Sequence, residues 1–157
     1  MALNLHGTCA AADDLLPAVE LYVPGVCLAC IDWADHLRHN GFTVTLHDTP
    51  DMASLKRRLK VPPAAESVLT ATVAGYFIEG HVPAGDIRQL LREKPKARGL
   101  AVPGLPRGAP GFETSNPFCE TGCTILDNAD GIRDARREPY ETLLVAPDGQ
   151  TSVWAKH

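Results

Sequence analysis

The chain has 157 residues, and the 45% of them that are hydrophobic suffice to fill the core of one domain. Its 15 Lys and Arg are outnumbered by 19 Asp and Glu, so the net charge of −4 gives no reason to expect nucleic acid or an anionic membrane as a partner. No stretch approaches the roughly 18 apolar residues of a membrane-spanning helix. We therefore expect no membrane insertion, and either a cytoplasmic protein or the mature part of an exported one.

The front half of the chain predicts regular secondary structure. Alternating β-prone residues predict strands, and apolar residues at helical spacing predict helices. In chain order we expect a flexible N-terminal arm over 1–18, a strand over 19–23, a helix over 29–40, a strand over 42–47, a helix that starts at Pro50 with Thr49 as its cap and ends at the double proline 62–63, two strands over 70–79 that turn at Gly75, and a helix over 84–93. The basic cluster KRRLK at 56–60 is expected to be the solvated face of the second helix.

The back half is irregular until its end. Residues 95–139 contain six prolines and six glycines, so we expect one long loop with no recognisable element. The chain then closes with TLLVA, the turn sequence PDGQ and TSVWA, which predict a hairpin over 142–155.

This order of elements is typical of a thioredoxin-like fold, although other mixed α/β folds share it. A βαβ unit, a second helix, an antiparallel hairpin and a third helix together give a mixed sheet flanked by helices. We predict that 19–157 forms one such α/β domain, with the long cysteine-containing loop placed before the C-terminal hairpin.

Cys27 and Cys30 stand at the turn from the first strand to the first helix. Unpaired backbone N–H groups and the positive end of the helix dipole favour thiolate over thiol at that place. The pair is therefore predicted to be a redox couple or part of a metal site, and buried structural thiols are the alternative.

A second pair, Cys119 and Cys123, lies in the sequence NPFCETGC within the long loop. Their spacing lets two sulfurs converge from one turn of chain, and a loop of this length can fold back over the first pair. The alternatives are a disulfide between these two cysteines or a link from the loop to the core. Cys9, in the N-terminal arm, is the fifth cysteine and is expected to be the spare one.

Four converging thiolates favour soft metal ions. Sites made only of thiolates select Cu(I), Zn(II) or iron–sulfur clusters. Two short cysteine pairs also suit a structural zinc site, while their spacing matches none of the common iron–sulfur patterns.

The other polar residues carry weaker signals. His81, in EGHVPA, is expected to be a hydrogen-bonded structural histidine, with a ligand or ligand-supporting role as the alternative. His36 and His39 are three apart in the first helix and can share one side of it. The sequence has no phosphate-binding loop, serine nucleophile elbow or paired carboxylates, so enzymatic activity is left open and binding is favoured.

Four stretches of the sequence resemble, in order, the CopG-type copper-resistance proteins, which are small periplasmic thioredoxin-like domains. They are CLACIDWADHLRHNGF, TATVAGYFIEGHVPAGDIRQLL, KARGLAVPGLPRGAPGFE and PYETLLVAPDGQTSVWA. The resemblance covers about residues 19–113 and 139–155, and it implies Cu(I) binding by clustered thiolates, as one ion or as a multinuclear cluster. It also implies a periplasmic or exported location and a role in copper redox chemistry.

The sequence departs from that family at several ligand positions. The family pattern Cys-x-Cys-Cys is matched at its outer places by Cys27 and Cys30, but Ala29 stands in the middle. A Cys-His pair of the family is replaced by Val68 and Leu69, and two methionines are replaced by Leu105 and Phe112. The metal ligands are therefore predicted to be the four cysteines at 27, 30, 119 and 123.

The leading hypothesis is a copper-binding protein of copper homeostasis or resistance, whose partners are copper ions and another copper-handling protein. The first alternative is a thiol–disulfide oxidoreductase that uses Cys27 to attack and Cys30 to resolve. Thr70 opposes this alternative, because thioredoxins place a cis-proline at the equivalent position to hold the partner chain. The second alternative is an interaction domain stapled by zinc or by disulfides, with the 95–139 loop as its binding surface.

Overall fold

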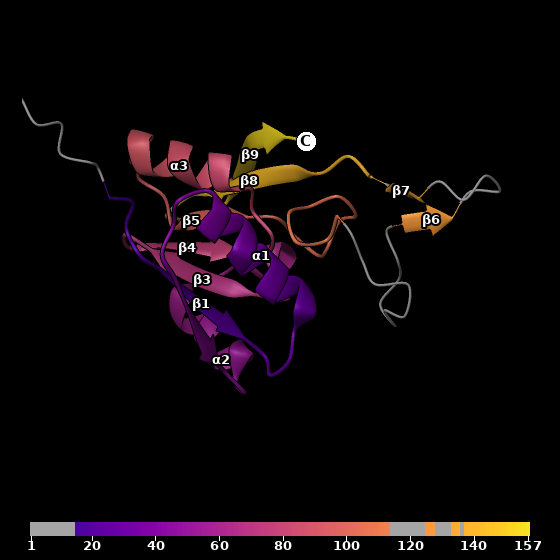
Figure 1. Ribbon diagram of the computed structural model, residues 1–157. Coiled ribbons are helices and arrows are strands. Elements are labelled where there is room, and N and C mark those ends of the chain that lie inside the picture. The colour runs from indigo at the N-terminus through magenta and orange to yellow at the C-terminus, as the bar shows by residue number, and fades with distance from the viewer. Residues whose placement is uncertain (1–14, 114–124, 128–132, 136) are drawn as a thin grey trace, which may run out of the picture.

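The computed structural model describes residues 15–113, 125–127, 133–135 and 137–157 (Figure 1). Its strands are β1 (Val19–Val23), β2 (Val44–Asp48), β3 (Thr70–Val73), β4 (Tyr76–Glu79), β5 (Gly99–Ala101), β6 (Ile125–Asp127), β7 (Arg133–Ala135), β8 (Glu141–Val145) and β9 (Thr151–Lys156). Its helices are α1 (Leu28–His39), α2 (Met52–Leu59), the short 3-10 helix η1 (Pro63–Ala65) and α3 (Ala84–Glu93). Within these residues, no helix has the length and hydropathy that a membrane span requires.

Seven strands form one mixed sheet in the order β2-β1-β3-β4-β5-β8-β9. The pairs β1–β2 and β4–β5 are parallel, and the other four neighbouring pairs are antiparallel. The remaining strands, β6 and β7, pair only with each other. This arrangement confirms the predicted thioredoxin-like α/β fold, including the hairpin at 70–79 and the C-terminal hairpin.

The central strands separate two hydrophobic clusters. Ile78 and Leu100 belong to the larger one, which also contains the buried faces of α1 and α3. Their strand neighbours Phe77 and Ala101 belong to the smaller one, together with Val61, just after α2. Because successive side chains of a strand point to opposite faces, both faces of the central sheet are covered.

One prediction was wrong: residues 95–139 do contain a regular element of the main sheet. Strand β5 lies between β4 and β8 and is buried throughout. It begins at Gly99, where a Cβ atom would lie 1.9 Å from the carbonyl oxygen of Phe77. Only glycine allows so close an approach of the two strands, and in the sequence this glycine is indistinguishable from the loop glycines around it.

The start of α2 also differs from the prediction. Asp51 caps the helix by accepting a hydrogen bond from the backbone N–H of Ser54 at 3.0 Å, while Pro50 precedes the helix. The Thr49 hydroxyl instead donates to the carbonyl of His47 at 3.2 Å. Aspartate is as good a cap as threonine, and both candidates stood in the sequence.

The basic cluster at 56–60 is not wholly a solvated face. Arg57 and Arg58 are exposed, but Lys56 is buried and its ammonium group forms an ion pair with Glu79 of β4. The prediction was wrong at Lys56, because charge patterning does not show which cation of a helix faces the sheet.

Candidate functional site

Cys27 and Cys30 occupy the turn from β1 to α1. Gly25, with φ +58°, turns the chain after the strand, and its N–H donates to the Asp48 carboxylate at 3.1 Å. Cys27 is the N-cap of α1, and its sulfur accepts from the N–H of Cys30 at 3.3 Å. The sequence therefore placed both sulfurs correctly at a helix N-terminus, where unpaired N–H groups favour negative charge.

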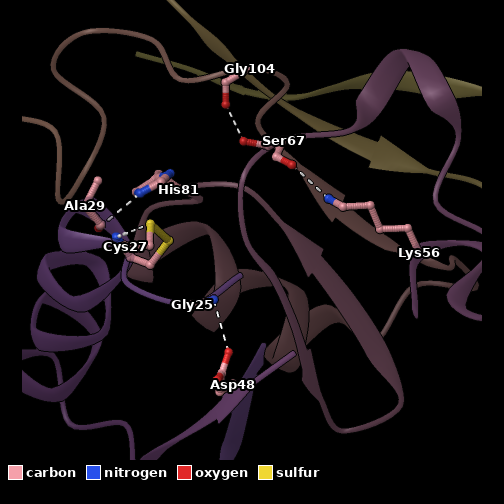
Figure 2. The surroundings of a disulfide bond; sticks show 9 residues. Gly25, Cys27, Ala29, Asp48, Lys56, Ser67, His81 and Gly104 are labelled. Atoms are coloured by element: carbon pink, nitrogen blue, oxygen red, sulfur yellow. Dashed lines mark hydrogen bonds between the residues drawn. A yellow bond between two sulfur atoms is a disulfide. The ribbon is translucent and has the colours of Figure 1, made fainter. Parts of the chain in front are cut away.

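The two cysteines form a disulfide, with their Cα atoms 5.2 Å apart (Figure 2). Cys30 is fully buried in the main hydrophobic cluster, while Cys27 is partly exposed. In this state the sulfurs are neither free structural thiols nor metal-binding thiolates. The disulfide is the oxidised form of the pair, and binding of a metal by these sulfurs requires its reduction.

His81 lies beside this turn. Figure 2 shows its imidazole next to the Ala29 carbonyl, and its Nε2 is 3.1 Å from that oxygen. The oxygen can only accept, so Nε2 carries the proton, and the buried Nδ1 has no hydrogen-bond partner among the described residues. Burial lowers the pKa of His81 to about 4, although the hydrogen bond to Ala29 partly opposes this effect, so the ring is neutral at pH 7.

The hydrogen bond of His81 is one of three that join α1 to residues 81–84. Trp33 donates its indole N–H to the carbonyl of Val82 at 2.9 Å, and the N–H of Ala84 donates to Nε2 of His36 at 3.1 Å. The helix positions used are 29, 33 and 36, which share one face at helical spacing. We call residues 81–84 the 81–84 segment, and it holds the helix that carries the disulfide.

The segment that follows β5, residues 102–111, reaches the same turn. A Cβ atom on Gly111 would lie 2.6 Å from the backbone nitrogen of Trp33 and 2.8 Å from the Ala29 oxygen. This segment therefore packs directly on the first turn of α1. Beyond it, Glu113 lines a hollow of about 380 Å³ together with His36 and other polar residues of α1.

A second polar group, which we call the Glu79 cluster, consists of Lys56, Ser67, Thr70 and Glu79. The Glu79 carboxylate is fully buried and accepts from the Ser67 N–H at 2.7 Å, from the Thr70 hydroxyl at 2.6 Å and from Lys56. Lys56 also donates to the Ser67 carbonyl at 2.8 Å. Burial raises the pKa of Glu79, while these donors oppose the rise.

Sequence reasoning missed the Glu79 cluster. The signal was a carboxylate two residues after Phe77 in a strand, which places it on the same face as a large apolar side chain. A carboxylate on a buried face needs several donors, and Lys56 together with the 67–70 segment supplies them.

Apolar side chains flank Cys27 on the surface. Val26 is 92% exposed, Leu28 66% and Ile31 41%. These are three of the seven large hydrophobic side chains that are exposed in the described part of the chain. Such a concentration around a reactive sulfur is typical of a surface that contacts another molecule.

The other predicted ligands, Cys119 and Cys123, and the spare Cys9, lie outside the described residues. Within 15–113 and 137–157, no three His, Cys, Asp or Glu side chains are grouped so that they could hold a metal ion. His36 and His39 do share one side of α1 and line the same hollow, but each ring has a backbone partner: Nε2 of His36 accepts from the Ala84 N–H, and Nδ1 of His39 contacts the Asp35 carbonyl at 2.7 Å. The four-cysteine site remains a prediction.

Known proteins that resemble this chain match it over most of its length. Residues 65–112 match a family described as a protein of unknown function, DUF411. Two solved structures of copper resistance protein CopG, forms 1 and 2, are each 37% identical to this chain, with a TM-score of 0.74. Each match covers 90% of this chain and 98% of the other. Among curated proteins, none matches.

Proposed function

Since this chain belongs to the CopG family of copper-resistance proteins, we propose that it acts in copper homeostasis or resistance by binding Cu(I) through cysteine thiolates. The observation that carries the proposal is the cysteine pair at the N-terminus of α1. Reduction of its disulfide supplies two soft sulfur donors, and the helix terminus stabilises their negative charge. These donors fit Cu(I), and zinc is the competing ion.

Cys119 and Cys123 are proposed to complete the site. The position of Glu113, the last described residue before Cys119, supports this. Glu113 lines a hollow with residues of α1, and Gly111 contacts the first turn of that helix. Six residues lead from there to Cys119, and an extended chain of that length spans about 20 Å. Chain length therefore allows both sulfurs to approach Cys27 and Cys30.

The departures from the family pattern limit the donor set. Ala29 replaces the middle cysteine of the family, and the hydrogen bond from His81 reaches its carbonyl. We therefore assign the ligands to Cys27, Cys30, Cys119 and Cys123 alone.

A Cu(I) titration tests this assignment. The fully reduced protein is titrated anaerobically with Cu(I) in competition with a chromogenic chelator, and Cys27→Ser and Cys123→Ser are compared with Cys9→Ser as the matched control. We expect the first two variants to lose at least about tenfold in affinity, because each removes one thiolate ligand, and the control to match the wild type. Unchanged affinity in both ligand variants would reject the site, and a preference for Zn(II) over Cu(I) would reject the metal.

A thiol–disulfide oxidoreductase is the second candidate, and the unequal exposure of the disulfide favours it. Cys27 is partly exposed, so its sulfur can react with the thiol or disulfide of a substrate. Cys30 is buried, as is expected of the thiol that resolves the mixed disulfide. Thr70 opposes this candidate, because thioredoxins have a cis-proline at the equivalent position to hold the partner chain. Here the Thr70 hydroxyl is buried and donates to Glu79 instead. Insulin reduction by a Cys119→Ser/Cys123→Ser variant, driven by a dithiol, is the test, and absence of turnover would exclude this activity.

We also propose a periplasmic or other exported location and exchange of Cu(I) with another copper-handling protein. The disulfide supports the location, since disulfides persist in oxidising compartments. The exposed Val26, Leu28 and Ile31 around Cys27 support the exchange. Fractionation of cells that express the natural gene tests the first proposal. For the second, Val26→Ser/Leu28→Ser should slow Cu(I) transfer to a partner while leaving Cu(I) affinity unchanged, and an unchanged transfer rate would contradict it.

A further inference from the structure

We propose that His81 is a positioning residue for the Cys27–Cys30 pair: its Nε2–H holds the Ala29 carbonyl and so fixes the turn at the geometry in which the two sulfurs close on each other. The inference concerns the same site as the proposed function, but it rests on the disulfide and not on copper.

The hydrogen bond from His81 reaches the backbone between the two cysteines. Ala29 is the residue immediately before Cys30, and its carbonyl accepts from His81 at 3.1 Å. The two other bonds of the 81–84 segment reach Trp33 and His36, which are further along the helix. Of these three bonds, only that of His81 reaches the turn between the two cysteines.

The backbone before His81 leaves the imidazole little freedom. Gly80 has φ +75°, and a Cβ atom there would lie 2.3 Å from the carbonyl of Val102. The N–H of Val82 donates back to the Gly80 carbonyl at 2.9 Å. His81 is thus presented from a tight turn that the neighbouring strand fixes, and it is fully buried.

The two nitrogens of the His81 imidazole differ in their hydrogen bonding. Nδ1 is buried without a hydrogen-bond partner in the described structure, which is unfavourable by about 1–3 kcal/mol for a typical polar group. A side chain needed only to fill this space would be more stable if it were apolar. The contact that offsets the burial is the hydrogen bond from Nε2 to Ala29, and this bond is made to the thiol turn.

Fixing the turn raises the effective concentration of one thiol at the other. When the pair closes, the two thiols lose two protons and two electrons, and one glutathione disulfide is reduced to two glutathione molecules. A preorganised turn favours closure because less conformational freedom is lost in forming the bond. A typical hydrogen bond changes such an equilibrium roughly threefold to tenfold.

The test measures this equilibrium in the full chain, without copper, across a series of glutathione redox buffers. After acid quench and alkylation, peptide mapping gives the fraction of the Cys27–Cys30 disulfide directly. We expect His81→Leu to lower the equilibrium constant for closure roughly threefold to tenfold. We expect His81→Gln to retain the wild-type value, because the amide nitrogen of glutamine can occupy the place of Nε2 and donate.

The matched control is His36→Leu, which removes a hydrogen bond of the same 81–84 segment, seven residues beyond Ala29. It should lower the thermal unfolding temperature and leave the redox equilibrium unchanged. An unchanged equilibrium in His81→Leu, or an equal loss in His36→Leu, would overturn the proposal. Equal loss in His81→Gln would also overturn it, since the imidazole itself would then be required.

His81→Met replaces His81→Leu if the latter does not fold. If neither apolar variant folds while His81→Gln does, the hydrogen bond serves the whole fold and the proposal fails. Failure of Cu(I) binding leaves this result intact, because no copper is present in the assay.

Discussion

Glu79 is the last residue of β4, and His81 follows it by two residues. Both side chains are buried, but they differ in how many of their polar atoms are hydrogen-bonded. The Glu79 carboxylate accepts from three donors that come from α2 and from the 67–70 segment. Within the part of the chain that the structure describes, the His81 imidazole makes one hydrogen bond and its Nδ1 has no partner. A fully satisfied buried group serves the stability of the fold, whereas a half-satisfied one suggests a functional constraint. We therefore expect Glu79 to serve the stability of the fold and His81 to serve the turn that carries the two cysteines.

The largest effect should come from removing the cation of the Glu79 cluster. Lys56→Met leaves the Glu79 carboxylate buried without its ion-pair partner, and we expect a loss of about 3–5 kcal/mol in the free energy of unfolding. Glu79→Gln in the same chain removes the unpaired charge and should restore most of the loss. Urea unfolding followed by circular dichroism measures both.

The exposed neighbour Arg58 provides the control for that experiment, since Arg58→Met should change stability by at most about 0.5 kcal/mol. If Lys56→Met changed the free energy of unfolding as little as this control, the Glu79 cluster would not be what stabilises the fold in this region.

A pH-dependent effect should follow for His81. Its pKa is about 4 in the folded protein and near 6.5 when unfolded, so the unfolded state binds more protons between these values. Stability should therefore fall as the pH falls from 6.5 to 4, by up to about 3 kcal/mol from this group. Urea unfolding at several pH values should show this slope in the wild type and lose it in His81→Gln. Equal slopes in the two proteins would show that His81 is not buried as a neutral base.

The smallest effect tests whether the segment 102–111 supports the same turn as His81. Gly111→Ala places a methyl group 2.6 Å from the backbone of α1 at a positive φ, and we expect a loss of about 2 kcal/mol. Gly104→Ala is the matched control, because Gly104 also has a positive φ but has no atom within 4 Å of the added Cβ. It should lose only about 1 kcal/mol. Thermal unfolding compares the two, and equal losses would mean that the contact with α1 contributes nothing.

Much of the fold was predictable because the elements obey local rules. The helix at 84–93 and the hairpin at 70–79 follow from apolar spacing and from a turn at Gly75, and both were predicted at their observed bounds. Strand β5 was not, because three residues among prolines and glycines carry no periodicity. Its place in the sheet depends on contacts with β4 and β8, which are distant in sequence.

The candidate site divides in the same way. The position of Cys27 and Cys30 at a helix N-terminus follows from the strand and helix patterns around them. The hydrogen bond between His81 and Ala29 joins residues 52 positions apart, and no local pattern predicts which carbonyl the imidazole meets.

The sequence by itself determined the thioredoxin-like order of elements, the two cysteines that open α1 and the chemistry of soft sulfur donors. These features depend on the spacing of residues close together in the sequence and on the intrinsic properties of their side chains. Both can be read from a single sequence. Tertiary structure decided that Lys56 is buried against Glu79, that β5 completes the sheet and that His81 holds the thiol turn. Each of these depends on which distant backbone groups the fold brings within hydrogen-bond range, and that is a property of the packed molecule.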